Sequence, residues 1–307
     1  MDELKGDVVM TEPQWQRLWE KSAIGTKIQG GGLKLYPEEV IFVHLHRHQP
    51  LPRDNWITDN MRSIPDLEDR YFILEALRVP GNLIRLYPSN NCAKGTWALR
   101  WHKEKHPDRD EPTSEVRWHR ALDQVDIMEL FDWTKQVESN SRLPEVLVID
   151  DEGSIVSYEL SICDPSSKGR HERTRNTTNP EDLGVKTQFR HRMSDIEKCM
   201  IENPSSSIHT TVLSDLIERG LSIRSGFKYG TLWRGYEEKV GTDHAPWLID
   251  TLIEAPINWT QACLNARLSA GVNKKYLVAI EDRDSKIQYL EFRRPPSDRR
   301  WTNTRRH

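Results

Sequence analysis

The sequence predicts a mixed α/β protein that consists of two related repeats. Two segments carry this prediction, PEVLVIDDEGSIVSYELSICDP from Pro144 and KKYLVAIEDRDSKIQYLEFRRP from Lys274. Each has two β-rich apolar runs joined by an acidic turn, which is typical of a hairpin. A helix is expected before each hairpin, starting at Asp132 in one repeat and at Asn258 in the other, because both are N-cap residues followed by Trp-Thr. Gly271 is placed to end the second helix.

The correspondence between the repeats continues upstream. LEALRVPGNLIR from Leu74 matches LSDLIERGLSIR from Leu213, and each is expected to form a helix, a stop and a strand. A segment rich in Ser, Gly, Arg, Asn and Pro separates the copies. We therefore expect a first repeat over residues 1–165, a linker over 166–190 and a second repeat over 191–307. The first repeat carries an additional N-terminal piece with a helix that begins at Pro37.

Composition excludes disordered and membrane-spanning classes. Charged residues make up 30% of the 307 residues and the mean hydropathy is -0.72, yet apolar patterning persists along most of the chain. No run approaches the roughly 20 apolar residues that a membrane span needs. The N-terminus MDELKGDVVM has no apolar core, so no secretory or transit signal is expected. We expect a cytoplasmic protein with no membrane partner.

Cysteine and histidine spacing does not predict a metal centre. Four cysteines are far apart, form no CxxC pair and are expected to be reduced packing residues: Cys92, Cys163, Cys199 and Cys263. If the segment that contains His44 and His48 is helical, these two histidines share one face, as two ligands of a metal ion would. No third ligand is evident near them or near His46. We therefore expect surface histidines, no metal and no cofactor.

Overall charge does not indicate a nucleic-acid partner, because the net charge is -3 and the pI is near 6.4. Arginine is nevertheless concentrated in two segments, residues 169–176 and the tail 293–307. The forked donors of arginine suit phosphate. A solvated linker and a frayed tail are equally good interpretations of these two segments.

Several short motifs follow one another between Ser225 and Arg294. They are GFKYG from Gly226, WRGY ending at Tyr236, His244 before an apolar Trp-Leu-Ile run, Arg267 on the expected helix, and Val-Asn-Lys ending at Lys274. Each motif alone is weak, but their order and spacing together are specific. This segment of about 70 residues closely resembles the catalytic domain of tRNA-splicing endonucleases. The archaeal homodimeric type of that family has a degenerate N-terminal repeat.

The resemblance implies a fold, an activity and a set of site residues. The second repeat would have a restriction-endonuclease-like mixed sheet flanked by helices, and the protein would cleave precursor tRNA at bulge-helix-bulge intron boundaries. Tyr236, His244 and Lys274 would form the catalytic triad. Arg267 and Arg293 would clamp an unpaired base of the RNA. The chain departs from the family in a short loop between the tyrosine and the histidine, and in Ala-Pro directly after His244.

These residue types also suit metal-independent RNA cleavage. The 2'-hydroxyl attacks the adjacent phosphate and leaves a 2',3'-cyclic phosphate and a 5'-hydroxyl. A histidine suits the proton donor to the departing 5'-oxygen. A lysine stabilises the extra negative charge on the phosphate. The tyrosine is either a base that neighbouring cations activate or a group that orients the 2'-hydroxyl.

Taken singly, each of these residues has a simpler interpretation. A lone tyrosine on a strand is usually a packing residue, a lone histidine a loop or core residue, and a lysine after a helix a solvated helix end. Arg267 fits a surface salt bridge as well as a base clamp, although arginine planes stack well on unstacked bases. The ordered set favours catalysis for the triad and base contact for Arg267.

The first repeat lacks the triad. By the offsets of the matching segments, the residues opposite Tyr236, His244 and Lys274 are Trp101, Arg109 and Leu143. The resemblance therefore implies a homodimer with one live site in the second repeat of each chain. In that family an acidic loop of a non-catalytic unit docks into a basic pocket. The candidate loop is Asp150, Asp151 and Glu152, and an ordinary solvated hairpin turn is the alternative.

Two other functions stay open from the residues. One is a metal-dependent nuclease in which Lys274 works with a carboxylate from Asp243, Asp250 or Glu254. The other is a non-catalytic RNA-binding or assembly subunit, against which the intact triad argues.

Overall fold

The computed structural model describes residues 6–11, 14–167, 183–203, 206–238, 240–241 and 243–295. The chain forms two compact units. The first consists mainly of residues up to Asp123 together with Lys135–Glu159, and the second of Gln124–Thr134 and Leu160–Arg294. The arginine-rich segment 169–176, most of the expected linker and the tail from residue 296 lie outside the described residues. Their proposed roles stay predictions.

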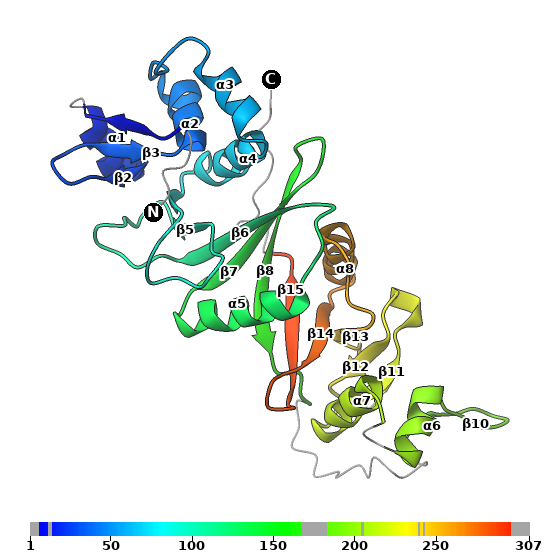
Figure 1. Ribbon diagram of the computed structural model, residues 1–307. Helices are drawn as coiled ribbons and strands as arrows, with labels where there is room; N and C mark the ends of the chain where they lie inside the picture. Colours follow the sequence, from blue (N-terminus) through cyan, green and yellow to red (C-terminus); the bar gives the residue numbers. More distant parts are fainter. Residues whose placement is uncertain are drawn as a thin grey trace. The chain divides into compact units, whose positions relative to one another are not determined.

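The second unit contains a mixed sheet (Figure 1). Its strands lie in the order β11 (Ser222–Ser225), β12 (Trp233–Tyr236), β13 (Trp247–Thr251), β14 (Lys275–Glu281) and β15 (Ile287–Arg293). Neighbouring strands are antiparallel except β13 and β14, which are parallel. Parallel neighbours need a crossover connection, and here it is helix α8 (Trp259–Gly271).

The first repeat, whose strands lie mainly in the first unit, has the same arrangement. Its strands are β4 (Leu83–Leu86), β5 (Ala98–Trp101), β6 (Ser114–Arg120), β7 (Leu143–Ile149) and β8 (Ile155–Cys163), and again only the third and fourth are parallel. Helix α5 (Ile127–Ser139) takes the place in the first repeat that α8 has in the second repeat. The predicted duplication and the mixed α/β class are therefore confirmed.

The two crossover helices differ in how well their starts were predicted. In α8 the Asn258 side chain accepts the backbone N–H of Gln261 at 3.0 Å, and the helix ends at Gly271 as expected. In α5 the expected start at Asp132 is wrong. The helix begins at Ile127, because the side chain of Asp126 accepts the backbone N–H of Glu129 at 2.9 Å and so caps the helix earlier.

Helices cover both faces of the second sheet. Helix α7 (Ile208–Glu218) contributes Leu213 and Leu216 to a buried cluster with Leu277 of β14. Side chains alternate between the faces of a strand, so the neighbouring Tyr276 points to the other face. There it packs on Phe292, with ring centroids 6.0 Å apart, and Phe292 also contacts Trp259 of α8. The predicted sheet flanked by helices is confirmed.

A buried carboxyl group connects three parts of this unit. Asp250 in β13 is 2% exposed and accepts hydrogen bonds from the Leu232 backbone N–H at 2.7 Å and the Tyr276 hydroxyl at 2.9 Å. Burial outweighs these hydrogen bonds and raises the pKa of Asp250 to about 6. Asp250 therefore joins the start of β12 to the start of β14 without making an ion pair in the described part of the chain.

The N-terminal piece packs around a separate small sheet. Its elements are β1 (Val8–Met10), α1 (Gln14–Ser22), β2 (Thr26–Lys27), β3 (Leu33–Leu35), α2 (Pro37–Arg47), α3 (Trp56–Ser63) and α4 (Leu67–Arg78). The predicted helix start at Pro37 is confirmed.

His48 follows α2 in a left-handed conformation with φ 54, so it does not continue the helical face of His44. His44 instead contacts the Gln49 carbonyl, and His46 lies 2.8 Å from Glu75.

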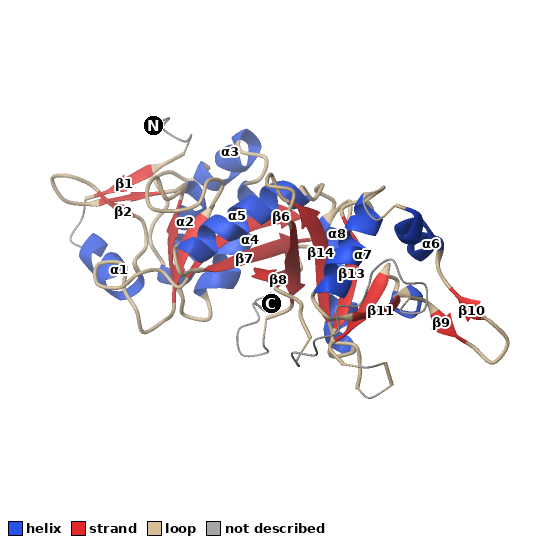
Figure 2. Cartoon of the chain, turned by 90° about the horizontal axis from the view of Figure 1, so that it is seen from below, coloured by secondary structure: helices blue, strands red, loops and turns tan. Residues whose placement is uncertain are grey.

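A short hairpin precedes the second repeat's helices. It consists of β9 (Val185–Lys186) and β10 (His191–Arg192) and extends beyond helix α6 (Asp195–Glu202) (Figure 2). Ser194 caps α6 by accepting the Glu197 backbone N–H. Among the described residues, no helix is long and apolar enough to cross a membrane.

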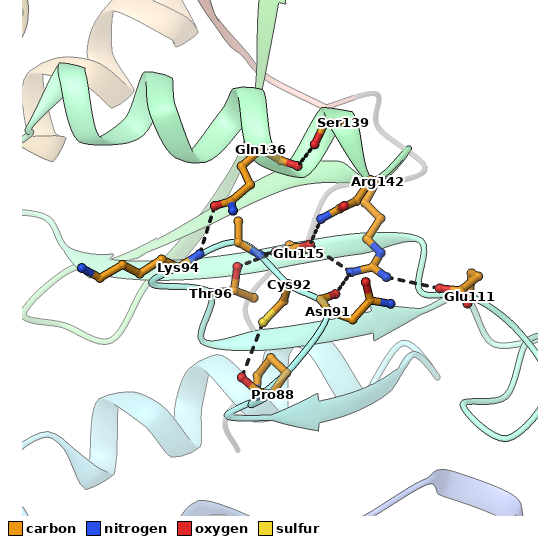
Figure 3. Close-up of polar contacts among 12 residues, drawn as sticks. Pro88, Asn91, Cys92, Lys94, Thr96, Glu111, Glu115, Gln136, Ser139 and Arg142 are labelled. Atoms are coloured by element: carbon orange, nitrogen blue, oxygen red, sulfur yellow. Dashed lines mark hydrogen bonds and ion pairs between the residues drawn. The ribbon is translucent and has the colours of Figure 1, made fainter.

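A buried ion pair organises the first unit between α5 and β7 (Figure 3). The Arg142 guanidinium, 5% exposed, lies 3.0 Å from Glu115 and also donates to the Asn91 carbonyl at 2.5 Å. Glu115 is fully buried and additionally accepts the Ala93 backbone N–H at 2.8 Å and the Thr96 hydroxyl at 2.6 Å. The pair therefore holds the β4–β5 loop against the start of β7.

We expect Arg142→Ala to lower the free energy of unfolding by about 3 to 5 kcal/mol, because it leaves the Glu115 carboxylate buried without its cation. The matched control is Arg120→Ala, which removes an exposed pair with Asp69 and should cost about 0 to 1 kcal/mol. Urea unfolding followed by circular dichroism measures both. Equal losses in the two variants would contradict a structural role for the buried pair.

Candidate active site

Strand register brings the predicted triad positions to one end of the second sheet. Gly235 pairs with Trp247 across β12 and β13, and Trp247 pairs with Lys275 across β13 and β14. Tyr236 and Lys274, each one residue beyond these pairs, therefore flank Pro246. Adjacent strands lie about 4.8 Å apart, so these three positions form one row. His244 lies two residues before Pro246 in the loop that leads into β13.

The end of α8 determines where Lys274 lies. Asn273 adopts a left-handed conformation with φ 54, and the Lys274 backbone N–H donates to the Ser269 carbonyl at 2.8 Å. This turn directs the lysine toward the loop before β13, where its Nζ donates to the carbonyl of Ala245. Lys274 is thus held beside the residue that follows His244.

The Ala-Pro departure from the family pattern fits this contact. Ala245 is 3% exposed and contributes its backbone carbonyl, which any residue type would supply. The backbone N–H of His244 donates to the Asp243 side chain at 2.7 Å, while the His244 side chain is exposed. The histidine is therefore accessible to a bound molecule.

Two cations lie over aromatic rings at this end of the sheet. The Arg234 guanidinium is 5.7 Å from the ring centre of Tyr236, which is 9% exposed, and the Lys274 ammonium is 5.3 Å from that of Tyr229. Arg234 and Tyr229 belong to the WRGY and GFKYG motifs, but nothing in those motifs indicates that their side chains lie beside Tyr236 and Lys274. The site can therefore hold an anion while offering a hydroxyl and an imidazole.

The two arginines expected to contact RNA lie in the same unit. Arg267 is exposed on α8, and Arg293 is the last residue of β15, exposed at the end where β14 begins. Their shared clamp stays a prediction.

Strand pairing corrects two of the three positions assigned to the first repeat. Ser114 pairs with Leu143 at the start of β6 and β7, as Trp247 pairs with Lys275 in the second repeat. Counting back along these strands places Glu111 opposite His244 and Arg142 opposite Lys274, in place of Arg109 and Leu143. The sequence offsets drifted because the loops before β6 and β7 differ in length between the repeats.

The degenerate site has a different chemistry. Glu111 and Arg142 form an ion pair at 3.2 Å, and Arg142 also binds the buried Glu115 (Figure 3). Trp101, opposite Tyr236 as predicted, is 3% exposed and donates its indole N–H to the Asp110 carbonyl at 2.8 Å. Trp101 and Arg142 are thus buried by internal contacts, whereas Glu111 is exposed like His244.

Two of the three carboxylates of the metal-dependent alternative are engaged within the protein, while the third, Asp243, is exposed and accepts the backbone N–H of His244. Asp250 binds Leu232 and Tyr276, and Glu254 accepts from the Thr251 hydroxyl at 2.6 Å and contacts His209 at 2.8 Å. In the described part of the chain no three His, Cys, Asp or Glu side chains are grouped as metal ligands would be.

The acidic turn between β7 and β8 is partly used by its own backbone. Asp150 accepts the backbone N–H of Ser154 at 2.6 Å and of Glu152 at 3.1 Å, and Gly153 has φ 72. The side chains of Asp151 and Glu152 are exposed. Of the three acidic residues, Asp151 and Glu152 are therefore the two whose side chains are exposed to a partner.

Part of the second unit is similar to a known catalytic domain. Residues 207–289 match the model of the tRNA intron endonuclease catalytic C-terminal domain. The chain is 26% identical over 182 residues to the tRNA-splicing endonuclease of Thermoplasma volcanium, which covers 57% of this chain and 61% of that protein. It is 35% identical over 89 residues to that of Hyperthermus butylicus, covering 28% of this chain and 49% of the relative. In each case the chain spans less than two thirds of the relative's length.

The matched segment runs from the start of α7 to β15 and includes Tyr236, His244 and Lys274. Over this segment, which carries the three predicted triad residues, the chain is similar to the catalytic domain of tRNA intron endonucleases.

Proposed function

We propose that this protein is an RNA endonuclease that removes introns from precursor tRNA by cutting at bulge-helix-bulge boundaries. The observation that carries the proposal is the row of Tyr236, Pro246 and Lys274 across three adjacent strands, with the exposed His244 beside it. This arrangement lies inside the segment that matches the catalytic domain. A cytoplasmic location is part of the same proposal, because it rests on the proposed substrate.

In the proposed reaction the 2'-oxygen of one nucleotide attacks the adjacent phosphorus while the bond from phosphorus to the 5'-oxygen breaks. His244 gives a proton to the departing 5'-oxygen, and the products are a 2',3'-cyclic phosphate and a 5'-hydroxyl. Lys274 would exchange its contact with the Ala245 carbonyl for a phosphate oxygen and so stabilise the developing charge. Tyr236 receives or orients the proton of the 2'-hydroxyl, with Arg234 over its ring.

We also propose that the active form is a homodimer. The first repeat has the strand order of the second but an ion-paired residue set in place of the triad. One chain therefore offers one site, whereas an intron has two ends. Two copies would supply two sites for the two bulges of one substrate, whose RNA helix is recognised mainly by shape.

The direct test is incubation of the purified full chain with an intron-containing precursor tRNA in excess chelator. We expect two cuts per intron and products with 2',3'-cyclic phosphate and 5'-hydroxyl ends. Cleavage that appears only when a divalent cation is added would favour the metal-dependent alternative. Binding without cleavage under all conditions would favour a non-catalytic RNA-binding subunit.

We expect His244→Ala to slow single-turnover cleavage by roughly 10² to 10⁴, because the departing 5'-oxygen loses its proton donor. RNA affinity should change little. His102→Ala, which alters an exposed histidine of the first repeat, is the control. If His244→Ala cleaves as fast as the control, His244 has no part in the chemistry.

We expect Arg267→Ala to slow cleavage of bulged RNA by about 5- to 150-fold, because one base-stacking contact is worth roughly 1 to 3 kcal/mol. Lysine should restore little activity, since it keeps the charge but lacks the plane. Arg62→Ala on α3 is the control at another exposed helical arginine. Full activity of Arg267→Lys would show that charge alone suffices.

We expect reversal of Asp151 and Glu152 to lysine to weaken the dimer roughly tenfold or more, because complementary charge determines interface register. Asp150 is left intact because it stabilises the turn. Asp284→Lys, in the equivalent turn between β14 and β15, is the matched control. Sedimentation velocity that finds the same dissociation constant for all three proteins would assign docking to another surface.

A further inference from the structure

One aromatic side chain beside the proposed active site is almost fully exposed. Phe227 lies in the 3₁₀ turn η1 (Phe227–Tyr229) and is 91% exposed. Two residues later, the Tyr229 ring is 5.3 Å from the Lys274 ammonium. Two peptide units span at most about 7.6 Å between Cα atoms, so Phe227 lies close to the lysine proposed to bind the scissile phosphate.

The turn that carries Phe227 is held in one conformation. The Tyr229 backbone N–H donates to the Gly226 carbonyl at 2.7 Å, and the Gly226 N–H donates to the Leu232 carbonyl at 3.0 Å. A Cβ atom on Gly226 would lie 2.4 Å from the Thr231 hydroxyl, so the turn closes only with glycine there. Gly230 ends the turn with φ 73, in the region that glycine tolerates best.

The buried carboxyl group of Asp250 also stabilises this turn. The Leu232 N–H donates to Asp250, so the strand that follows the turn is tied to the sheet interior. Phe227 thus projects from a rigid support toward solvent, and its ring gains nothing from packing in the protein. A rigid aromatic ring can bind a partner ring without first losing conformational freedom.

We propose that Phe227 is a base-stacking residue that holds one nucleotide base next to the scissile phosphate. This inference rests on the proposed function and adds a contact that neither the triad nor the two arginines supply. Bulge nucleotides are unpaired, so their bases are available to stack on protein aromatic side chains. Lys274 would hold the phosphate, while Phe227 would receive the adjoining base and so fix the in-line geometry of the 2'-oxygen.

Exposure alone does not make the assignment, because single exposed apolar residues are common on protein surfaces. Phe189 is exposed to 88% but lies in the turn between β9 and β10, and no contact of the described chain connects it to the proposed triad. Phe189 therefore provides a control of the same residue type and similar exposure. Phe227 differs from it by the neighbouring Tyr229–Lys274 contact.

The test is a double-mutant cycle in which protein variants are combined with altered RNA substrates. Phe227→Ala, Phe227→Trp and Phe189→Ala are assayed by single-turnover cleavage of a bulged RNA. The same RNA is also prepared with an abasic residue on either side of the scissile phosphate. We expect Phe227→Ala to lose about 5- to 150-fold on intact RNA and Phe227→Trp to retain most of the activity. With the abasic residue at the stacked position, Phe227→Ala and wild type should cleave equally slowly.

Binding separates this inference from the proposed reaction. A substrate with a 2'-deoxy nucleotide at the cleavage site cannot react, so its dissociation constant measures contacts alone. Phe227→Ala should bind intact RNA more weakly than wild type, with the difference lost on the abasic RNA. An RNA that binds in this pattern but is never cleaved would overturn the proposed activity and leave the stacking contact standing.

Three results would overturn the stacking contact itself. One is wild-type cleavage and binding by Phe227→Ala. Another is an equal loss on intact and abasic RNA at both flanking positions, which would show that the variant perturbs the turn instead of a base contact. The third is an equal loss in Phe189→Ala that is likewise removed by the abasic residue.

Discussion

The parallel pairing of β13 with β14 is the constraint on which the proposed site depends. Parallel neighbours require a crossover, and helix α8 supplies it and ends directly before β14. The same register that pairs Trp247 with Lys275 places Lys274 at the loop that carries His244. A shift of one residue would turn the β14 side chains to the opposite face and would break the core of Tyr276 and Leu277. Core packing therefore protects the geometry of the site.

The two repeats use this constraint for different purposes. In the second repeat, the position after the crossover holds a partly exposed lysine whose ammonium donates to a backbone carbonyl, a contact that a phosphate oxygen can replace. In the first repeat, the equivalent Arg142 is buried and pairs with the buried Glu115 and with Glu111, whose side chain is exposed. A buried arginine with paired carboxylates is costly to expose. The same strand arrangement thus places a partly exposed cation, Lys274, in the second repeat and a buried ion pair, Arg142–Glu115, in the first.

Asp250 links the core to the surface of the site. Its pKa of about 6 reflects burial in β13, and its oxygens bind Leu232 and Tyr276. Leu232 follows the turn that carries Phe227 and Tyr229, so the position of both aromatic rings depends on a group inside the sheet. Because these hydrogen bonds already hold the site residues in place, the site loses little conformational freedom when it binds a ligand.

Local sequence determined much of this protein. The duplication, both hairpins, the Asn258 cap and the start of α2 follow from patterns of a few residues, and the structure confirms them. The order of the motifs also predicted the similarity of residues 207–289 to the tRNA intron endonuclease catalytic domain. The start of α5 was harder to predict because two aspartates, Asp126 and Asp132, are both suitable N-cap residues, and only Asp126 caps the helix.

Only the tertiary structure decided which residues meet. The equivalence of Glu111 with His244 and of Arg142 with Lys274 depends on strand register, which loops of unequal length conceal in the sequence. The burial of Asp250 and the exposure of Phe227 are likewise invisible in a motif, because GFKYG reads the same whether its phenylalanine packs inward or faces solvent. Sequence patterns report on neighbours along the chain, whereas a site is made by neighbours across strands.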